Sequence, residues 1–362
     1  MLNPCESVAN PAADSAVEHQ AWYKSPMAQP ESLTAHAPCR VDLAGGTVDI
    51  WPLYLFHPGA VTVNFAVSVL TRCTVRRLAG KKIHLKSLDT GAEDRFADCH
   101  ELCAAKKVRH ALAAYLIRFF CPEGGLELET HSESPAGAGI SGSSALMIAT
   151  TAALARWTGR KLDLEEIRVL AQNVEAQLIR VPTGCQDYYP ALYGGVSAIH
   201  LDPDGIHRQA VPVPAEEIDA RFLLVYTGAP RQSGINNWEV FKAHINGDRR
   251  VFRNFEEIVG VARAMHAALA AAQWEEVARL LRAEWKLRKT NAPGITTPLI
   301  DKLMAVAGRN GGLAAKVCGA GGGGCVIFQV EPEAKPRVAE AIRTSGGQIL
   351  AFQVARQGLR YA

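Results

Sequence analysis

The sequence predicts an α+β fold of two domains with a cleft between them. The chain has 362 residues, about twice the length of a typical domain. Strand-like and helix-like patterns occur together in both halves, and a stretch rich in Pro, Asp and Gly at 202–214 separates the halves. We therefore expect residues 1–30 to form a flexible tail, residues 31–205 the first domain and residues 215–362 the second.

In the first domain, alternation of polar and apolar residues predicts strands at 40–43, 61–67, 73–78, 82–88, 126–130 and 196–201. Residues 107–120 have helical spacing, with apolar side chains on one face. The helix after the Gly/Ser loop 135–144 is apolar nearly all round, so we expect it to be buried. The capping box at 163–166 begins a further helix, which ends near Arg180 before Pro182.

The second domain begins with the apolar segment 222–226, which predicts a strand. Helical patterns follow, and the chain closes with strands around a Gly run and one more helix. We expect helices near 236–245, 250–272, 275–288, 298–307 and 336–344, and strands at 326–330 and 349–354.

The composition excludes several classes of protein. Hydrophobic residues make up 48% and charged residues 21%, which excludes general disorder, collagen-like repeats and coiled coil. The net charge is +3 with no long basic run, so neither nucleic acid nor a membrane is implied as a partner. Nine cysteines without a C-x-x-C pair, and a start that lacks a secretory signal, indicate a cytoplasmic protein with reduced thiols. The charge balance permits a monomer or a homodimer.

The most informative segment is the Gly/Ser loop before the buried helix. A glycine-rich turn that opens a helix exposes unpaired N–H groups at the positive end of the helix dipole, where phosphate oxygens bind. Two serine hydroxyls at its end can reach phosphate or a bound Mg²⁺. The predicted phosphate-binding residues are Pro135, Gly137, Ala138, Gly139, Ile140, Ser141, Gly142, Ser143 and Ser144.

Other interpretations of this loop are less consistent with its context. Gly137-x-Gly139-x-x-Gly142 matches the dinucleotide-binding fingerprint, but that motif needs a strand after the helix, and the segment from Leu164 is another helix. The same glycines resemble the start of a Walker A motif, but Ser143 stands where that motif needs Lys. A flexible loop capped by serine is the remaining alternative.

Two further loops carry candidate residues. The segment 37–49 contains Arg40, which could stabilise charge on a phosphoryl group. It also contains Asp49, which could hydrogen-bond with hydroxyl groups of a substrate. The alternative to a functional role is that Arg40 and Asp42 form a pair on the surface of a strand. The Gly run within 316–325 fits close approach to a ligand or to another loop, although glycines also make simple strand-to-strand turns.

Two acidic residues complete the candidate site. Glu175 lies about 80° from the centre of the apolar face of its helix. It is therefore either a boundary glutamate in solvent or a magnesium ligand, because hard cations take carboxylate oxygens. Asp187 follows a helix end and could cap the next element, or accept a proton from a substrate hydroxyl.

In this order, the three loops resemble motifs of the GHMP kinase superfamily, named for galactokinase, homoserine kinase, mevalonate kinase and phosphomevalonate kinase. The resemblance spans roughly residues 36–355. The first loop resembles P-x-R-[VI]-x-[LF]-x-G-G-x-x-D, the second P-x-x-x-G-x-x-S-S-A and the third K-x-x-G-A-G-G-G-G. Details of the first loop and of 226–233 resemble the sugar-kinase branch that contains D-glycero-D-manno-heptose 7-phosphate kinase and galactokinase. Galactokinases have Glu-His where this chain has Gly46-Thr47.

The resemblance implies a GHMP kinase-like fold, with an ATP-binding first domain and the active site in the interdomain cleft. It implies transfer of the γ-phosphoryl group of ATP to a hydroxyl, the anomeric one, of a sugar or sugar phosphate. Asp187 would be the base with Arg40 beside it, and Ser144 and Glu175 would bind Mg²⁺. The implied substrate-binding residues are Gly46, Thr47, Asp49, Gly184, Gly321 and Gly322. The alternatives are a small-alcohol kinase of the mevalonate type and a non-catalytic nucleotide or sugar sensor.

Overall fold

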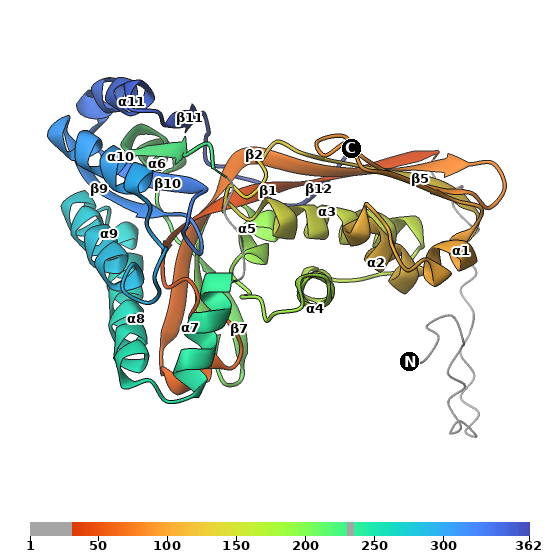
Figure 1. The fold of residues 1–362 in the computed structure, drawn as a ribbon, viewed down its shortest axis with the longest axis horizontal. Helices are drawn as coiled ribbons and strands as arrows, with labels where there is room; N and C mark the ends of the chain where they lie inside the picture. The colour runs from red at the N-terminus through yellow and green to blue at the C-terminus, as the bar shows by residue number, and fades with distance from the viewer. Residues whose placement is uncertain (1–30, 230–234) are drawn as a thin grey trace.

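A 19-residue strand, β2, runs through the larger of two β-sheets in the computed structural model (Figure 1). The structure describes residues 31–229 and 235–362, and the predicted tail at 1–30 lies outside them. The strands are β1 (Ser32–Ala44), β2 (Ala60–Leu78), β3 (Ile83–Ser87), β4 (Glu93–Phe96), β5 (Gly125–Ser132), β6 (Val196–Asp202), β7 (Gly205–Ala210), β8 (Phe222–Tyr226), β9 (Gly312–Val317), β10 (Cys325–Val330), β11 (Gln348–Leu350) and β12 (Arg360–Tyr361).

Helices cover both sheets. They are α1 (Cys99–Ala104), α2 (Ala111–Phe120), α3 (Gly142–Trp157), α4 (Leu164–Ile179), α5 (Tyr188–Tyr193), α6 (Ala215–Arg221), α7 (Ile235–Ile245), α8 (Arg249–Ala270), α9 (Trp274–Arg288), α10 (Pro298–Arg309) and α11 (Lys335–Thr344), with short 3-10 turns η1 (Leu53–Phe56) and η2 (Pro332–Ala334). The α+β class expected from the sequence is confirmed. None of the described helices combines the length and apolarity needed to cross a bilayer.

The larger sheet has the strand order β12-β1-β2-β5-β3-β4, with β6 paired to the start of β2 and β7 paired to β6. Its pairs are antiparallel except β3 with β5. The sequence pattern divided β2 into strands at 61–67 and 73–78, and that division is wrong. The residues between them contain neither Gly nor Pro, so the strand continues, although its register against β1 shifts between Val67 and Leu70.

Helix α3 packs on β1 and β2 and carries the Gly/Ser loop at its start (Figure 1). From Ala145 to Ala155 every residue except Leu146 is buried, as its uniformly apolar sequence predicts. Small residues allow α3 to approach the sheet closely. The Asp163–Glu166 capping box is also present at the start of α4. These contacts hold the N-terminal end of α3 against the strand that carries Arg40.

The second sheet has the order β11-β8-β10-β9, and α10 and α11 pack beside it. Helices α8 and α9 connect it with the first sheet, because α8 packs on β2 and α9 on β9. The chain then returns to the first sheet, where β12 pairs with β1 and Ala355 bonds with Ala66. The two parts are therefore joined along several elements, and loops from both meet at one cavity.

Candidate active site

A cavity of about 350 Å³ is bordered by the three loops that the sequence singled out. Arg40 and Asp49 come from the first loop or its strand, residues 135–144 from the second, and Gly319 and Ala320 from the third. The predicted site residues that line it are Arg40, Thr47, Asp49, Pro135, Gly137, Ala138, Gly139, Ser141, Gly142, Ser143, Ser144, Glu175, Gly184 and Asp187. Segments separated by up to about 280 residues thus form one site.

Four predicted residues lie behind the cavity wall instead. Ile140 is buried, and its carbonyl accepts a hydrogen bond from the backbone N–H of Arg40. Gly46 lies under three side chains. The expectation that Gly321 and Gly322 line the acceptor side needs correction, because they pack on Ile295 and the wall is made by Gly319 and Ala320.

The Gly/Ser loop has the geometry of an anion site. Gly137, Gly139 and Ser141 have φ of 68°, 76° and 60°, so the backbone folds tightly before α3 begins at Gly142. Ser141 occupies the N-cap position without making a side-chain cap bond. The N–H groups of the first turn therefore lack a side-chain cap from Ser141 and are available to anionic oxygens.

Glu175 is buried under this loop, at 5% exposure, and not in solvent. Its Oε1 accepts a 2.8 Å hydrogen bond from Ser143 Oγ, and its Oε2 accepts one of 2.6 Å from the Tyr188 hydroxyl. Burial raises the pKa of Glu175, while the bonds from Tyr188 and Ser143 oppose that shift. A carboxylate directed at a phosphate-binding loop fits a hard divalent cation.

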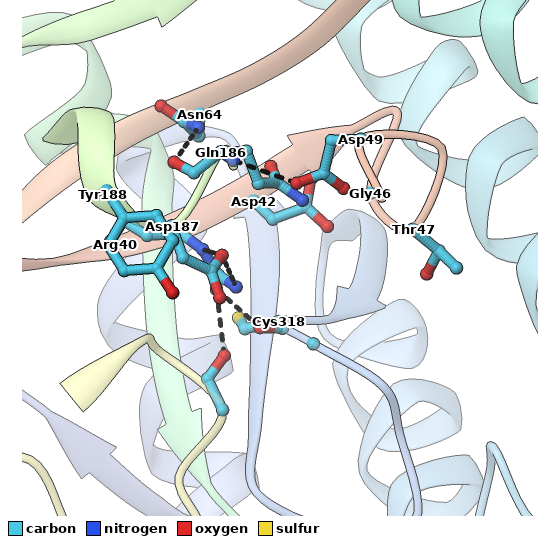
Figure 2. Close-up of polar contacts among 12 residues, drawn as sticks. Arg40, Asp42, Gly46, Thr47, Asp49, Asn64, Gln186, Asp187, Tyr188 and Cys318 are labelled. Atoms are coloured by element: carbon cyan, nitrogen blue, oxygen red, sulfur yellow. Dashed lines mark hydrogen bonds and ion pairs between the residues drawn. The ribbon is translucent and has the colours of Figure 1, made fainter. Parts of the chain in front are cut away.

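Arg40, which is buried, and Asp187, which is partly exposed, form an ion pair on the cavity wall (Figure 2). Arg40 Nε and Nη2 both donate to Asp187 Oδ1, at 2.9 and 2.6 Å. Nη1 donates to the carbonyls of Gly139 and Cys318, at 2.9 and 2.8 Å. Arg40 thereby connects the Gly/Ser loop, the closing Gly run and Asp187.

In this ion pair Arg40 keeps its positive charge, and one oxygen of Asp187 remains able to accept a proton. Burial works against the Arg40 charge, but the nearby carboxylates of Asp187 and Asp42 outweigh it and raise the Arg40 pKa. Both bonds to Asp187 end on Oδ1, and the hydrogen bonds among residues 31–229 and 235–362 leave Oδ2 without a protein partner. Asp187 is the N-cap residue of α5 but makes no side-chain cap bond, so its carboxylate is not used to cap the helix.

Asp49 lies on the same wall, buried at 3% exposure. Its Oδ2 accepts a 2.9 Å hydrogen bond from the backbone N–H of Gln186 (Figure 2). A Cβ added to Gly184 would lie 2.5 Å from the Asp49 Cγ, so only glycine leaves room for this carboxylate. Burial, together with the charge of Asp187, raises the pKa of Asp49 to about 7.

Four buried charged residues beneath the cavity were not identified as a group from the sequence. Lys316 Nζ donates to Asp42 Oδ2 at 2.8 Å, and Glu284 lies 3.9 Å from Lys316 and 3.8 Å from Arg288. Burial raises the pKa of Glu284 to about 7, although Lys316 and Arg288 oppose that shift. The one sign of this cluster in the sequence was that Asp42 and Lys316 are charged residues among the apolar residues of their strands. The surface pair of Arg40 and Asp42, considered as an alternative, is excluded because both are buried.

Arg288 connects this cluster with two of the loops that border the cavity. Its Nη1 donates to the Gly46 carbonyl at 3.0 Å, and its Nη2 donates to Thr47 Oγ1 and to the Gly319 carbonyl at 3.2 and 3.0 Å. Thr47 in turn donates to Asn237 Oδ1 of α7. The first and third loops are therefore held together at the end of the cavity where Asp49 lies.

Replacing Lys316 with Met is expected to lower the free energy of unfolding by about 3–5 kcal/mol. The change leaves the buried carboxylates of Asp42 and Glu284 with Arg288 as their remaining nearby cation in the cluster. Urea unfolding measures the loss. Lys289→Met, an exposed position on the same part of the chain, is the control and should change the value by less than about 0.5 kcal/mol. Equal effects of the two substitutions would contradict a stabilising cluster.

Comparison with known families gives two matches. Residues 102–195 match the GHMP kinases N-terminal domain, and residues 265–348 match the GHMP kinases C-terminal domain. The first match includes the Gly/Ser loop, Glu175 and Asp187, and the second includes Arg288, Lys316 and the Gly run.

Similar proteins and structures cover nearly the whole chain. D-glycero-alpha-D-manno-heptose 7-phosphate kinase of Campylobacter jejuni is 26% identical over 340 residues, which are 91% of this chain and 98% of that protein. A crystal structure of D-glycero-D-manno-heptose 1-phosphate kinase from Bacteroides thetaiotaomicron is 22% identical with a TM-score of 0.72, over 91% of this chain and 98% of that one. Lactococcus lactis galactokinase complexed with galactose is 20% identical with a TM-score of 0.75, over 92% and 95%.

Proposed function

The chain belongs to the GHMP kinases, and from this premise we propose that it transfers the γ-phosphoryl group of ATP to the anomeric hydroxyl of a sugar phosphate. The observation that carries the proposal is the Arg40–Asp187 pair, which lies between the Gly/Ser loop and the Asp49 end of one cavity. The heptose phosphate kinases similar to this chain support a sugar phosphate as the acceptor class.

The second loop and Glu175 would hold the nucleotide. The backbone N–H groups at the start of α3 would bind the phosphates, and the loop's positive φ angles keep that backbone close to them. Glu175 and the hydroxyls of Ser143 and Ser144 supply oxygen donors of the kind that Mg²⁺ prefers. Bound Mg²⁺ would neutralise charge on the β- and γ-phosphates.

Asp187 would act as the general base. Its Oδ2 accepts the proton of the acceptor hydroxyl while the hydroxyl oxygen forms its bond to the γ-phosphorus. The bond between that phosphorus and the bridging oxygen breaks, and the electron pair leaves with ADP. Arg40 holds the carboxylate in place through Oδ1, and one hydrogen of its Nη2 remains for a phosphate oxygen.

The Asp49 end of the cavity would bind the sugar. Asp49, Thr47 and Asn237 offer a carboxylate, a hydroxyl and an amide within one small region. This set suits several hydroxyl groups on one ligand. Gly46 lets three neighbouring side chains pack closely behind this region, because a Cβ there would lie 2.7–2.9 Å from Asp42, Arg288 and Gln186.

A coupled ADP-release assay tests the proposal. The panel contains hexoses, heptoses, their phosphates and mevalonate, each with Mg·ATP, and phosphorus NMR identifies the product. We expect turnover with at least one sugar phosphate, a new anomeric phosphate in the product, and none with mevalonate. Tight Mg·ATP binding without turnover on any polyol would instead support a non-catalytic sensor.

Asp49→Asn is expected to stabilise the protein at pH 8 and to impair acceptor binding. The folded pKa of about 7 lies above the ordinary value of 3.8. Between these values the folded state holds a proton that the unfolded state has lost, so wild-type stability falls as pH rises through this window. The variant lacks this cost and should gain roughly 2–4 kcal/mol above pH 7 and almost nothing near pH 4.

Activity should depend on pH in the opposite direction to stability, because it requires the ionised form of Asp49. Wild-type kcat/KM for the acceptor should fall as pH drops below about 7, because a protonated Asp49 accepts fewer hydroxyl bonds. Asparagine should lower kcat/KM about tenfold or more and remove that part of the pH profile. Melting temperatures and initial rates at pH 5 to 8 give both readouts. A variant with unchanged acceptor KM would exclude Asp49 from the acceptor site.

A further inference from the structure

Tyr188 is the residue next to Asp187 and the first residue of α5 (Figure 2). Its side chain is fully buried, and its ring belongs to the main hydrophobic core. Its hydroxyl donates a 2.6 Å hydrogen bond to Glu175 Oε2. One residue therefore connects the backbone of the proposed base with the carboxylate proposed to bind Mg²⁺.

The position of this hydroxyl is fixed from several directions. Helix α5 packs on β1, α3 and α4, so its first turn moves little relative to the Gly/Ser loop or to Glu175. The side chain of Thr183, on the cavity wall, lies close to the Tyr188 hydroxyl. Hydrogen bonds thus run from Tyr188 through Glu175 to Ser143 at the start of α3, with Thr183 beside the Tyr188 end.

Ser143 donates to Glu175 Oε1 and Tyr188 to Oε2, and the hydroxyl of Ser144 also lies close to this carboxylate. A carboxylate oxygen accepts more than one bond, so both can still face a cation. With both donors in place the carboxylate plane cannot rotate freely about the last side-chain bond. Donors behind a metal-binding carboxylate set its direction, and their removal typically weakens metal binding.

We propose that Tyr188 is a positioning residue, whose hydroxyl holds the Glu175 carboxylate in the orientation that binds the nucleotide-associated Mg²⁺ and in register with Asp187. The proposal rests on the proposed function. Tyr188 itself does not line the cavity, because its hydroxyl is directed at Glu175 and its ring at the core.

Tyr188→Phe removes the hydroxyl and keeps the ring. Binding of Mn²⁺ in the presence of a nonhydrolysable ATP analogue, followed by electron paramagnetic resonance, measures the metal site without turnover. We expect the dissociation constant for Mn²⁺ to rise roughly ten- to hundredfold. The Mg²⁺ concentration for half-maximal rate should rise by a similar factor, and excess Mg²⁺ should restore much of the activity.

Tyr189→Phe is the matched control. Tyr189 is the next residue, equally buried, and its hydroxyl also donates to a glutamate, Glu165, at 3.2 Å. Glu165 does not line the cavity. A purely structural role for Tyr188 predicts that both variants lose stability and keep their metal affinity. Tyr188→Phe with the Mn²⁺ affinity of Tyr189→Phe would overturn the proposal.

Two further outcomes separate this proposal from the proposed function. A wild-type protein that binds no Mn²⁺ with the nucleotide analogue overturns the kinase site and this inference together. A wild-type protein that binds it, with no change in Tyr188→Phe, overturns the inference alone. If Tyr188→Phe does not fold, Tyr188→His keeps a ring but moves the polar atom away from Glu175, and an unchanged Mn²⁺ affinity in that variant counts equally against the proposal.

Discussion

Asp187→Asn is expected to lower kcat at least about a thousandfold while the affinity for Mg·ATP stays within about threefold of wild type. The amide cannot accept the hydroxyl proton, so the acceptor oxygen keeps it as the bond to phosphorus forms. Asparagine retains the shape of the side chain and one oxygen that can accept the two Arg40 bonds. Single-turnover rates and nucleotide binding by calorimetry measure the two quantities.

Asp187→Ala serves as the comparison. Alanine leaves the buried Arg40 guanidinium without the carboxylate that offsets its burial. We therefore expect this variant to lose about 3–5 kcal/mol of stability in addition to turnover. If Asp187→Asn keeps more than a tenth of the wild-type kcat, Asp187 is not the base and the proposed chemistry is wrong.

The loops could be located from the sequence because each carries its own local signal. Glycines and serines before an apolar helix indicate an anion site whatever they face in the fold. The burial of α3 follows from its composition alone. Resemblance to known motifs then ordered the loops into one site, and the structure places all three at one cavity.

The charged cluster beneath the cavity could not be predicted in the same way. Asp42 and Lys316 are 274 positions apart, and each is an ordinary polar residue within its own strand. Their pairing depends on how β1 and β9 are brought together, which no local pattern contains. The same is true of Arg288, whose three acceptors lie on two different loops.

Two smaller features of the site could also not be predicted from the sequence. Glu175 lies at the edge of its helix's apolar face, and helical geometry cannot tell whether solvent or another element covers that edge. Here Tyr188 and Ser143 cover it. In the Gly run, the sequence does not say which residues face the cavity. Gly321, Gly322, Gly323 and Gly324 all have positive φ, and Gly321 and Gly324 also lie against the backbone of Ile295 and Ala138, so the turn and its close approach to other loops account for glycine there.

Gly184→Ala is expected to reduce kcat/KM for the acceptor by about a hundredfold or more with little change in the affinity for Mg·ATP. The backbone of Gly184 is not left-handed, so lack of space and not conformation excludes a side chain there. The new methyl group would overlap the Asp49 carboxylate, which must then leave its bond to the Gln186 N–H. Initial rates over a range of acceptor concentrations separate this effect from a loss of nucleotide binding.

Gly308→Ala controls for the generic effect of replacing a glycine. Gly308 lies in α10 with nothing within 4 Å of an added Cβ, and alanine should stabilise that helix by about 0.5–1 kcal/mol without affecting rates. The double variant Gly184→Ala, Asp49→Ala keeps the new methyl group and removes the carboxylate that it would overlap. It should recover the melting temperature lost in Gly184→Ala, but not the acceptor KM, because the hydroxyl-binding carboxylate is gone. Recovery of both quantities would show that Asp49 obstructs the site instead of binding the acceptor.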